Sequence, residues 1–100
     1  MNIFEQMLSR YEITTDNDLK NATYEVMQEI TLAALWRGGF FEKIAFYGGT
    51  CLRIFHSMPR FSEDMDFSLL SRDGEFDLES YFPAIIAEFK AAGRGVEINL

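Results

Sequence analysis

The chain has 100 residues, of which 48% are apolar and 25% charged, enough for one domain with a buried core and too little for two. Its single cysteine excludes a disulfide framework and a multi-cysteine zinc module, and its apolar stretches are far shorter than the ~20 residues of a membrane span. The net charge is −7, the basic residues are scattered singly and the N-terminus lacks a signal peptide, so we expect a cytoplasmic domain without membrane contact that needs cations to handle phosphates.

Two helices are predicted before the first strand. Apolar residues at helical spacing predict a short amphipathic helix over residues 3–11. Residues 14–17 are good N-cap types and begin a longer helix that runs to about Trp36, where Gly38 and Gly39 end it. The predicted buried face of this second helix comprises Leu19, Val26, Met27, Ile30, Ala33 and Ala34.

A strand, a tight turn and a helix follow in the predicted order. Residues 44–47 form a short apolar run that ends at Gly48, Gly49 and Thr50. Thr50 is predicted to cap the next helix, which Pro59 stops because its ring cannot continue the hydrogen-bond ladder. The apolar side of that helix would carry Leu52, Ile54 and Phe55.

From Phe61 the pattern changes to a period of two, which predicts a half-buried strand. A polar turn over residues 71–75 then leads to a helix that ends near Ala92. Asp77 or Ser80 caps this helix; Ser80 is slightly preferred because it leaves Pro83 in the first turn. Residues 96–100 are predicted to form a last strand.

The predicted fold is therefore α+β, a two-layer arrangement of about three strands in a small mixed sheet flanked by helices. Residues 1–100 form one domain, with N-terminal helices over 3–37 and a core over 43–100. Because the chain stops inside a strand-like segment, we expect it to be the N-terminal portion of a longer domain.

The diglycine turn is the first feature with chemical meaning. Glycine lets the backbone approach a phosphate closely, and a helix N-terminus presents free N–H groups to an anion. Alone, Gly48 and Gly49 fit a purely structural turn at least as well.

The second feature is the pair Asp64 and Asp66. On a strand these carboxylates point to one face, with Cα atoms about 6.6 Å apart. They repel each other unless a cation lies between them, and Mg²⁺ takes carboxylate oxygens together with substrate phosphates. Two such ions can hold the attacking and leaving oxygens of a phosphoryl displacement. By itself, an Asp-x-Asp pair is more often surface charge.

The two features together resemble the core of DNA polymerase beta-like nucleotidyltransferases. In more detail, residues 46–53 (FYGGTCLR) followed by residues 59–67 (PRFSEDMDF) are similar to the AbiEii/AbiGii toxin family. That family comprises nucleotidyltransferase-like toxins of bacterial abortive-infection and type IV toxin–antitoxin systems. The resemblance covers about residues 44–70.

The resemblance implies roles for individual residues. Gly48, Gly49 and Thr50 would contact the triphosphate of a nucleoside triphosphate, and Asp64 and Asp66 would be metal ligands for Mg²⁺ or Mn²⁺. Further residues at the family's positions are Arg53, Arg60 and Ser62.

These further residues have structural alternatives. Either arginine could pair with phosphate, or with a neighbouring acid instead. Ser62 could orient one of the aspartates or simply start the strand. A third carboxylate is usual in the superfamily on a later strand, where Glu97 is the candidate; the alternative is an exposed strand acid.

The function implied is transfer of a nucleoside monophosphate from a triphosphate to an acceptor, with pyrophosphate leaving. The family suggests an RNA acceptor such as the tRNA 3′ end, and a toxin neutralised by a cognate antitoxin. The alternative is a truncated, non-catalytic domain of the same fold that binds nucleotide or a protein partner.

Overall fold

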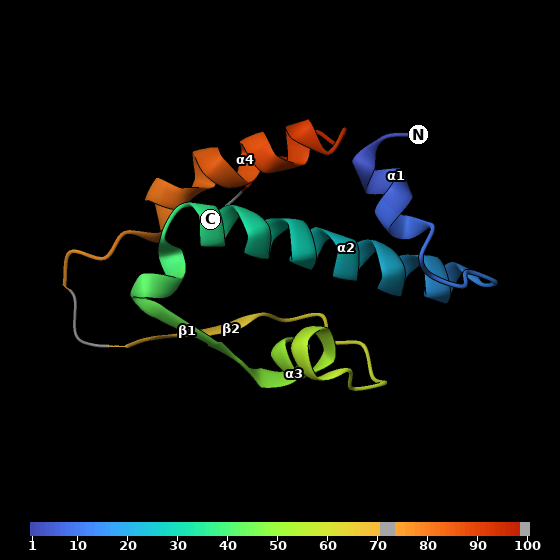
Figure 1. Cartoon of the computed structure of the whole chain (residues 1–100), viewed down its shortest axis with the longest axis horizontal. Helices are drawn as coiled ribbons and strands as arrows, with labels where there is room; N and C mark the ends of the chain where they lie inside the picture. The colour runs from blue at the N-terminus through green and yellow to red at the C-terminus, as the bar shows by residue number, and fades with distance from the viewer. Residues whose placement is uncertain (71–73, 99–100) are drawn as a thin grey trace.

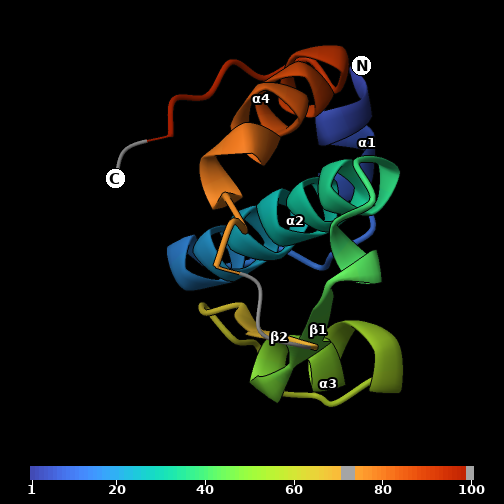
Figure 2. The same cartoon turned by 90° about the vertical axis from the view of Figure 1, so that its left-hand side faces the viewer.

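The computed structural model of the chain describes residues 1–70 and 74–98. Helix α2 (Asp16–Arg37) runs through the middle of the molecule. On one side it is covered by α4 (Phe82–Ala91) and the short α1 (Ile3–Leu8), and on the other by the sheet and α3 (Figures 1 and 2). A helical layer and a sheet layer thus share α2.

Helix α2 begins where the polar cluster predicts it. The Thr15 hydroxyl accepts from the Asp18 N–H at 3.0 Å, while the Asp18 carboxylate accepts from the Thr15 N–H, which makes a capping box. Hydrogen bonds from Thr14 and Thr15 lower the pKa of Asp18, because they favour its charged form. The helix ends before Gly39, which has a left-handed φ of 79°.

The sheet consists of β1 (Ile44–Tyr47) and β2 (Asp66–Leu69), paired antiparallel with Tyr47 opposite Asp66. The α+β class is confirmed, but among the described residues the sheet has two antiparallel strands rather than three in a mixed sheet. The strand predicted from Phe61 begins only at Asp66. The reason is that β1 turns into α3 at Gly48, so the residues before Asp66 have no strand to pair with.

The predicted last strand is also absent from its described part. Residues 96–98 form no strand, while 99 and 100 lie outside the described residues. Val96 and Ile98 pack against the hydrophobic core instead. Both side chains are half-buried there while Glu97 between them is exposed, which accounts for the alternating pattern.

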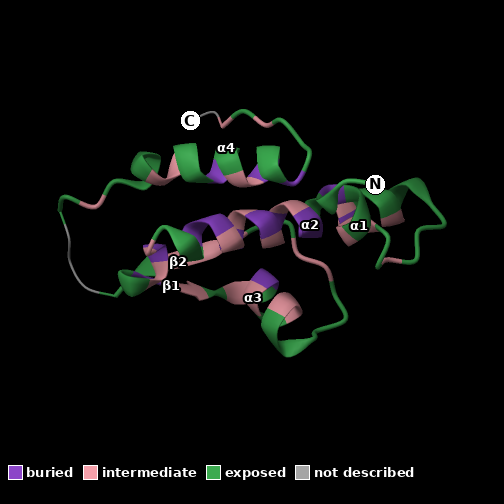
Figure 3. Cartoon of the chain, turned by 45° about the horizontal axis from the view of Figure 1, so that its top comes forward, coloured by how far each residue is buried: buried purple, intermediate pink, exposed green. Residues whose placement is uncertain are grey.

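Short 3₁₀ turns connect these elements, η1 (Phe40–Glu42) before β1 and η2 (Leu78–Tyr81) before α4. Asp77 caps η2, so α4 begins at Phe82 rather than directly after Ser80, with Pro83 in its first turn as predicted. The core lies between α2, α4 and η1 (Figure 3). Its buried residues are Phe4, Val26, Ile30, Ala34, Leu35, Phe40, Ile44, Ile85, Phe89 and Ala92.

Helix α3 (Gly48–His56) departs from its predicted burial. Leu52 and Phe55 are exposed and Ile54 is half-buried, because α3 rests on the sheet through its first turn, where Thr50 is its one buried residue. Leu19 on α2 is exposed as well, since the first turns of that helix extend beyond the core.

Candidate functional site

The site begins at the bend between β1 and α3. Gly48 has a φ of 86°, which L side chains rarely adopt. Because Tyr47 pairs with Asp66, the Asp66 side chain lies directly over Gly48, and a Cβ built there would overlap its Oδ2 atom. Asp66 therefore lies against the diglycine bend, and both the positive φ and this close approach favour glycine at position 48. Asp64, which the sequence predicts to lie beside Asp66 on one face of the same strand, precedes the first residue of β2.

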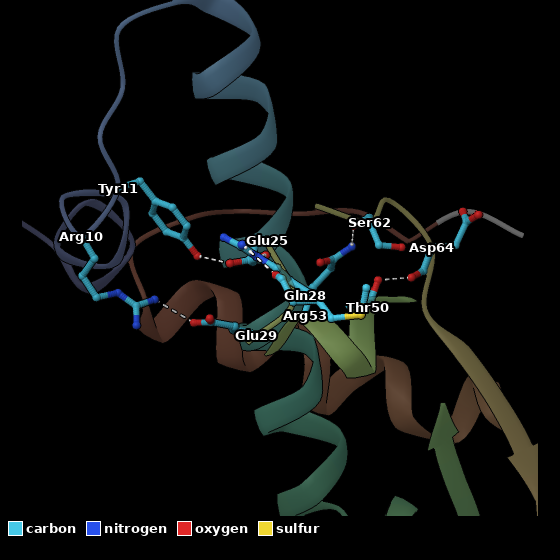
Figure 4. Close-up of polar contacts among 10 residues, drawn as sticks. Arg10, Tyr11, Glu25, Gln28, Glu29, Thr50, Arg53, Ser62 and Asp64 are labelled. Carbon is cyan, nitrogen blue, oxygen red and sulfur yellow. Dashed lines mark hydrogen bonds and ion pairs between the residues drawn. The ribbon is translucent and has the colours of Figure 1, made fainter. Parts of the chain in front are cut away.

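Ser62 packs against the second glycine of the bend. A Cβ built on Gly49 would lie 3.2 Å from Ser62 Oγ. The Ser62 carbonyl accepts a 2.8 Å hydrogen bond from Gln28 Nε2, which reaches across from α2 (Figure 4). Ser62 thus lies beside the bend, on the segment that connects α3 to β2 (residues 57–65, hereafter the α3–β2 loop).

Thr50 is not the N-cap residue of α3 that the sequence predicts. Helix α3 has Tyr47 at its N-cap without a side-chain cap, and Thr50 lies inside the helix, 1% exposed. Its hydroxyl donates to the backbone carbonyl of Asp64, and Figure 4 shows the Asp64 carboxylate directed away from Thr50. Thr50 therefore positions Asp64 through the backbone, and its hydroxyl is committed to that contact.

Several predicted residues line one hollow of about 710 Å³ between α2 and the α3–β2 loop. This volume is within the range of small-molecule sites. The hollow, called here the α2–loop hollow, brings together Gly49, Arg60, Ser62 and Asp64. Its remaining lining residues are Asn21, Tyr24, Met58, Pro59, Phe61 and Glu63.

Among the described residues, some charged groups at this hollow have a partner of opposite charge and others do not. Lys20 Nζ lies 3.4 Å from Glu63 Oε1, so this acid has a basic partner. Within residues 1–70 and 74–98, the side chains of Arg60, Asp64 and Asp66 make no ion pair or hydrogen bond with one another or with other residues. The carboxylate oxygens of Asp64 and Asp66 therefore have no partner among the described residues, and carboxylate oxygens are the ligands that a hard divalent cation prefers.

These two carboxylates suit an ion that also binds substrate. Among the described residues, no three His, Cys, Asp or Glu side chains are grouped to hold a metal ion between them. Mg²⁺ commonly takes one or two carboxylates and completes its shell with phosphates and water. Asp64 and Asp66 could hold such an ion together with a polyphosphate.

Glu97 is not brought to the two aspartates. It is exposed and lies in the segment after α4, which Figure 2 shows across α2 from β2. The physical reason is the missing third strand: without it, nothing in the described part of the chain brings residue 97 to the sheet.

Arg53 is committed to other groups within the protein. Its Nε donates to Glu25 Oε2 at 2.8 Å, its Nη1 donates to the Met58 carbonyl at 3.0 Å, and its guanidinium lies 4.0 Å from the Phe61 ring centroid. Of the two alternatives for this arginine, the structure has the pairing with an acid. Arg53 therefore fastens the α3–β2 loop to α2.

Glu25 and Gln28 are functional neighbours that the sequence interpretation missed. Both are buried on α2, and Glu25 also accepts a 2.8 Å hydrogen bond from the hydroxyl of Tyr11 (Figure 4). Partial burial, followed by this bond, raises the pKa of Tyr11, so the phenol stays a donor at neutral pH. Glu25 and Gln28 share a helical spacing with the apolar residues Leu32 and Leu35. The sequence could therefore have indicated two polar side chains on a buried helix face.

No helix in the described part of the chain combines the length and apolar character that crossing a bilayer requires. Comparison with known proteins gives one family match: residues 30–100, more than half of the chain, match the family described as nucleotidyl transferase AbiEii toxin, type IV TA system. Searches of curated proteins and of solved structures give no significant match.

Proposed function

Because the chain belongs to the AbiEii family of nucleotidyltransferase toxins from type IV toxin–antitoxin systems, we propose that its site transfers a nucleoside monophosphate from a nucleoside triphosphate to an acceptor. Pyrophosphate leaves, and Mg²⁺ or Mn²⁺ is required. The substrates, the metal and the roles of individual residues are all part of this proposal.

One observation carries the proposal: Asp66 lies against the glycine bend at the start of α3, and Asp64 lines a hollow that the same bend also lines. Within the bend, Asp66 lies over Gly48, and Gly49 lines the hollow. The backbone N–H groups in the first turn of α3 have no intrahelical partners, so they can bind phosphate oxygens beside the two carboxylates. Neither feature alone would select a polyphosphate with a divalent cation.

In this mechanism the residues of the chain bind and orient. Asp64 and Asp66 hold the cation, which supplies positive charge at the phosphoryl group. The N–H groups of Gly49 and Thr50 and the guanidinium of Arg60 hold the phosphate oxygens, which aligns the α-phosphate with the attacking hydroxyl. Arg53 acts indirectly, because it holds the loop that carries Arg60 and Ser62.

Family membership supports two further partners. A toxin of a type IV system implies a cognate antitoxin, and an RNA such as tRNA is the proposed acceptor. The chain has a net charge of −7, so little of the RNA-binding surface is expected on these 100 residues. The cytoplasm is the proposed location.

Calorimetry tests the metal–nucleotide site directly. Each of the four nucleoside triphosphates is titrated with Mg²⁺ into the wild type and into a variant with Asp64→Asn and Asp66→Asn. We expect binding and a raised melting temperature in the wild type, and loss of both in the variant, because the neutral amides no longer hold the cation.

The matched control removes the same number of charges elsewhere, with Glu12→Gln and Glu97→Gln. Both side chains are exposed, and the structure places Glu97 away from the aspartates, so binding should be unchanged. A double aspartate variant that binds like the wild type would overturn the proposed site. Binding without pyrophosphate release on addition of RNA would favour the non-catalytic alternative.

A further inference from the structure

One wall of the α2–loop hollow takes no part in the proposed chemistry. Asn21 and Tyr24 are three residues apart on α2, so they lie on the same side of the helix and line the hollow opposite the loop. Tyr24 is 42% exposed. Within the described chain, the Asn21 side chain has no hydrogen-bond partner, although its amide carries both donors and an acceptor.

A basic neighbour lies over the Tyr24 ring. Lys20, one turn earlier, places its ammonium 5.6 Å from the ring centroid, and the same ammonium pairs with Glu63 across the hollow. The cation–π contact favours this orientation of the ring, and the ion pair keeps the ammonium near it. An aromatic ring that is exposed to a hollow offers a stacking surface for another planar group.

We propose that this wall binds the nucleobase of the triphosphate, with the Tyr24 ring stacking on the base and the Asn21 amide hydrogen-bonding to its edge. This inference rests on the proposed function, which places the phosphates at the bend and the aspartates. The hollow extends from Gly49 and Asp64 to the α2 wall, so one nucleotide would span both.

The charges along the hollow agree with this orientation. Asp64 and Arg60, whose side chains make no ion pair or hydrogen bond with other described residues, are on the loop side, where metal and phosphates are proposed to bind. Among the described residues, Asn21 and Tyr24 line the α2 side with an amide and a phenol, which suit an uncharged, planar heterocycle. Glu63, which also lines the hollow, forms an ion pair with Lys20 of α2.

The test compares a nucleotide with a ligand that has phosphates but no base. ATP, GTP, CTP, UTP and inorganic tripolyphosphate, each with Mg²⁺, are titrated calorimetrically into the wild type, Tyr24→Ala and Tyr24→Phe. Tyr24→Ala should weaken nucleotide binding about tenfold, the loss of one base–aromatic stack, and leave tripolyphosphate binding unchanged. Tyr24→Phe keeps the ring and should bind like the wild type.

Trp36→Ala is the matched control, because Trp36 is an exposed aromatic residue on the same helix that does not line this hollow. Asn21→Ala should change the ratio of affinities among the four nucleotides about tenfold. Unchanged ratios would overturn the role of Asn21.

The outcomes separate this inference from the proposed function. If the wild type binds tripolyphosphate and nucleotides but Tyr24→Ala binds nucleotides normally, the base subsite is overturned and the phosphate site stands. If the wild type binds neither ligand, the proposed function fails and the inference fails with it.

Discussion

Gly48 and Gly49 are adjacent, yet different side chains lie over them. Gly48 combines a positive φ with the close approach of Asp66, whereas Gly49 faces Ser62 at ordinary helical torsions. The first glycine therefore sets the position of a proposed metal ligand, and the second leaves room on the side of the hollow.

Gly48→Ala should destabilise the domain and weaken the site together. The left-handed torsion costs an alanine about 1–3 kcal/mol, and the new methyl group displaces the Asp66 carboxylate. We expect Mg²⁺-dependent nucleotide binding to fall at least about tenfold, as it does when groups that orient metal ligands are changed. Urea unfolding measures the first effect and calorimetry the second.

The matched control is Gly95→Ala, because a Cβ at Gly95 meets nothing within 4 Å and its φ is not positive. Its stability and binding should stay close to those of the wild type. Equal stability and affinity for the Gly48 and Gly95 variants would contradict the role assigned to Asp66.

Thr50 and Arg53 show the limit of residue-level interpretation. Both match the family pattern, but Thr50 donates its hydroxyl to Asp64 and Arg53 pairs with Glu25. Residue type and spacing indicate that such groups belong near the site. Which atom each one binds depends on partners 14 and 28 residues away in the chain.

At the scale of elements, α2 links the helical layer to the site. Its buried Glu25 receives Tyr11 from the segment after α1 and Arg53 from α3, and its Gln28 holds Ser62 on the loop. A loop of nine residues without regular structure is thereby tied to a rigid helix. Such support is how a scaffold holds binding groups in position.

Glu25→Gln should loosen this connection. Removing one charge from a largely buried pair is expected to cost about 2–3 kcal/mol, below the value for a fully buried pair because 21% of the Arg53 side chain is exposed. Nucleotide affinity should fall as well, since Arg53 no longer holds Met58 and Phe61 in place. Urea unfolding and calorimetry report the two effects.

The Arg10–Glu29 pair provides the control, because it has the same 2.8 Å separation but an arginine that is 55% exposed. Glu29→Gln should change stability by less than about 1 kcal/mol and leave nucleotide affinity unaltered. Similar losses of stability in the two variants would mean that burial does not make the Glu25–Arg53 pair more stabilising than the exposed pair.

At the scale of the whole molecule, Phe40 joins the two layers. It is 1% exposed, and its ring packs edge-on against Phe67 of β2 at 5.1 Å and Tyr81 of η2 at 5.2 Å between centroids. Phe41 and Phe76 extend the same aromatic cluster. Phe40 therefore fastens the sheet that carries Asp66 to the helical core, together with the buried Ile44 of β1.

Phe40→Ala should remove about 3–5 kcal/mol of stability, a large share of what a domain of this size has. The loss comes from the transfer of the ring to water and from the cavity left among its aromatic neighbours. Phe55→Ala, at a position that is 64% exposed, should change stability far less. The midpoint of urea unfolding compares the two, and equal shifts would contradict a single shared core.

The sequence by itself determined the helices, the first strand, the diglycine bend, the aspartate pair and the family. Periodicity, capping and turn chemistry act over a few neighbouring residues, so α2, β1 and the stop at Gly39 could be predicted. Only the tertiary structure decided where β2 begins, which atoms Thr50 and Arg53 bind, and that Glu97 lies away from the sheet. Those outcomes depend on which distant segment covers each side chain, and local sequence does not encode that choice.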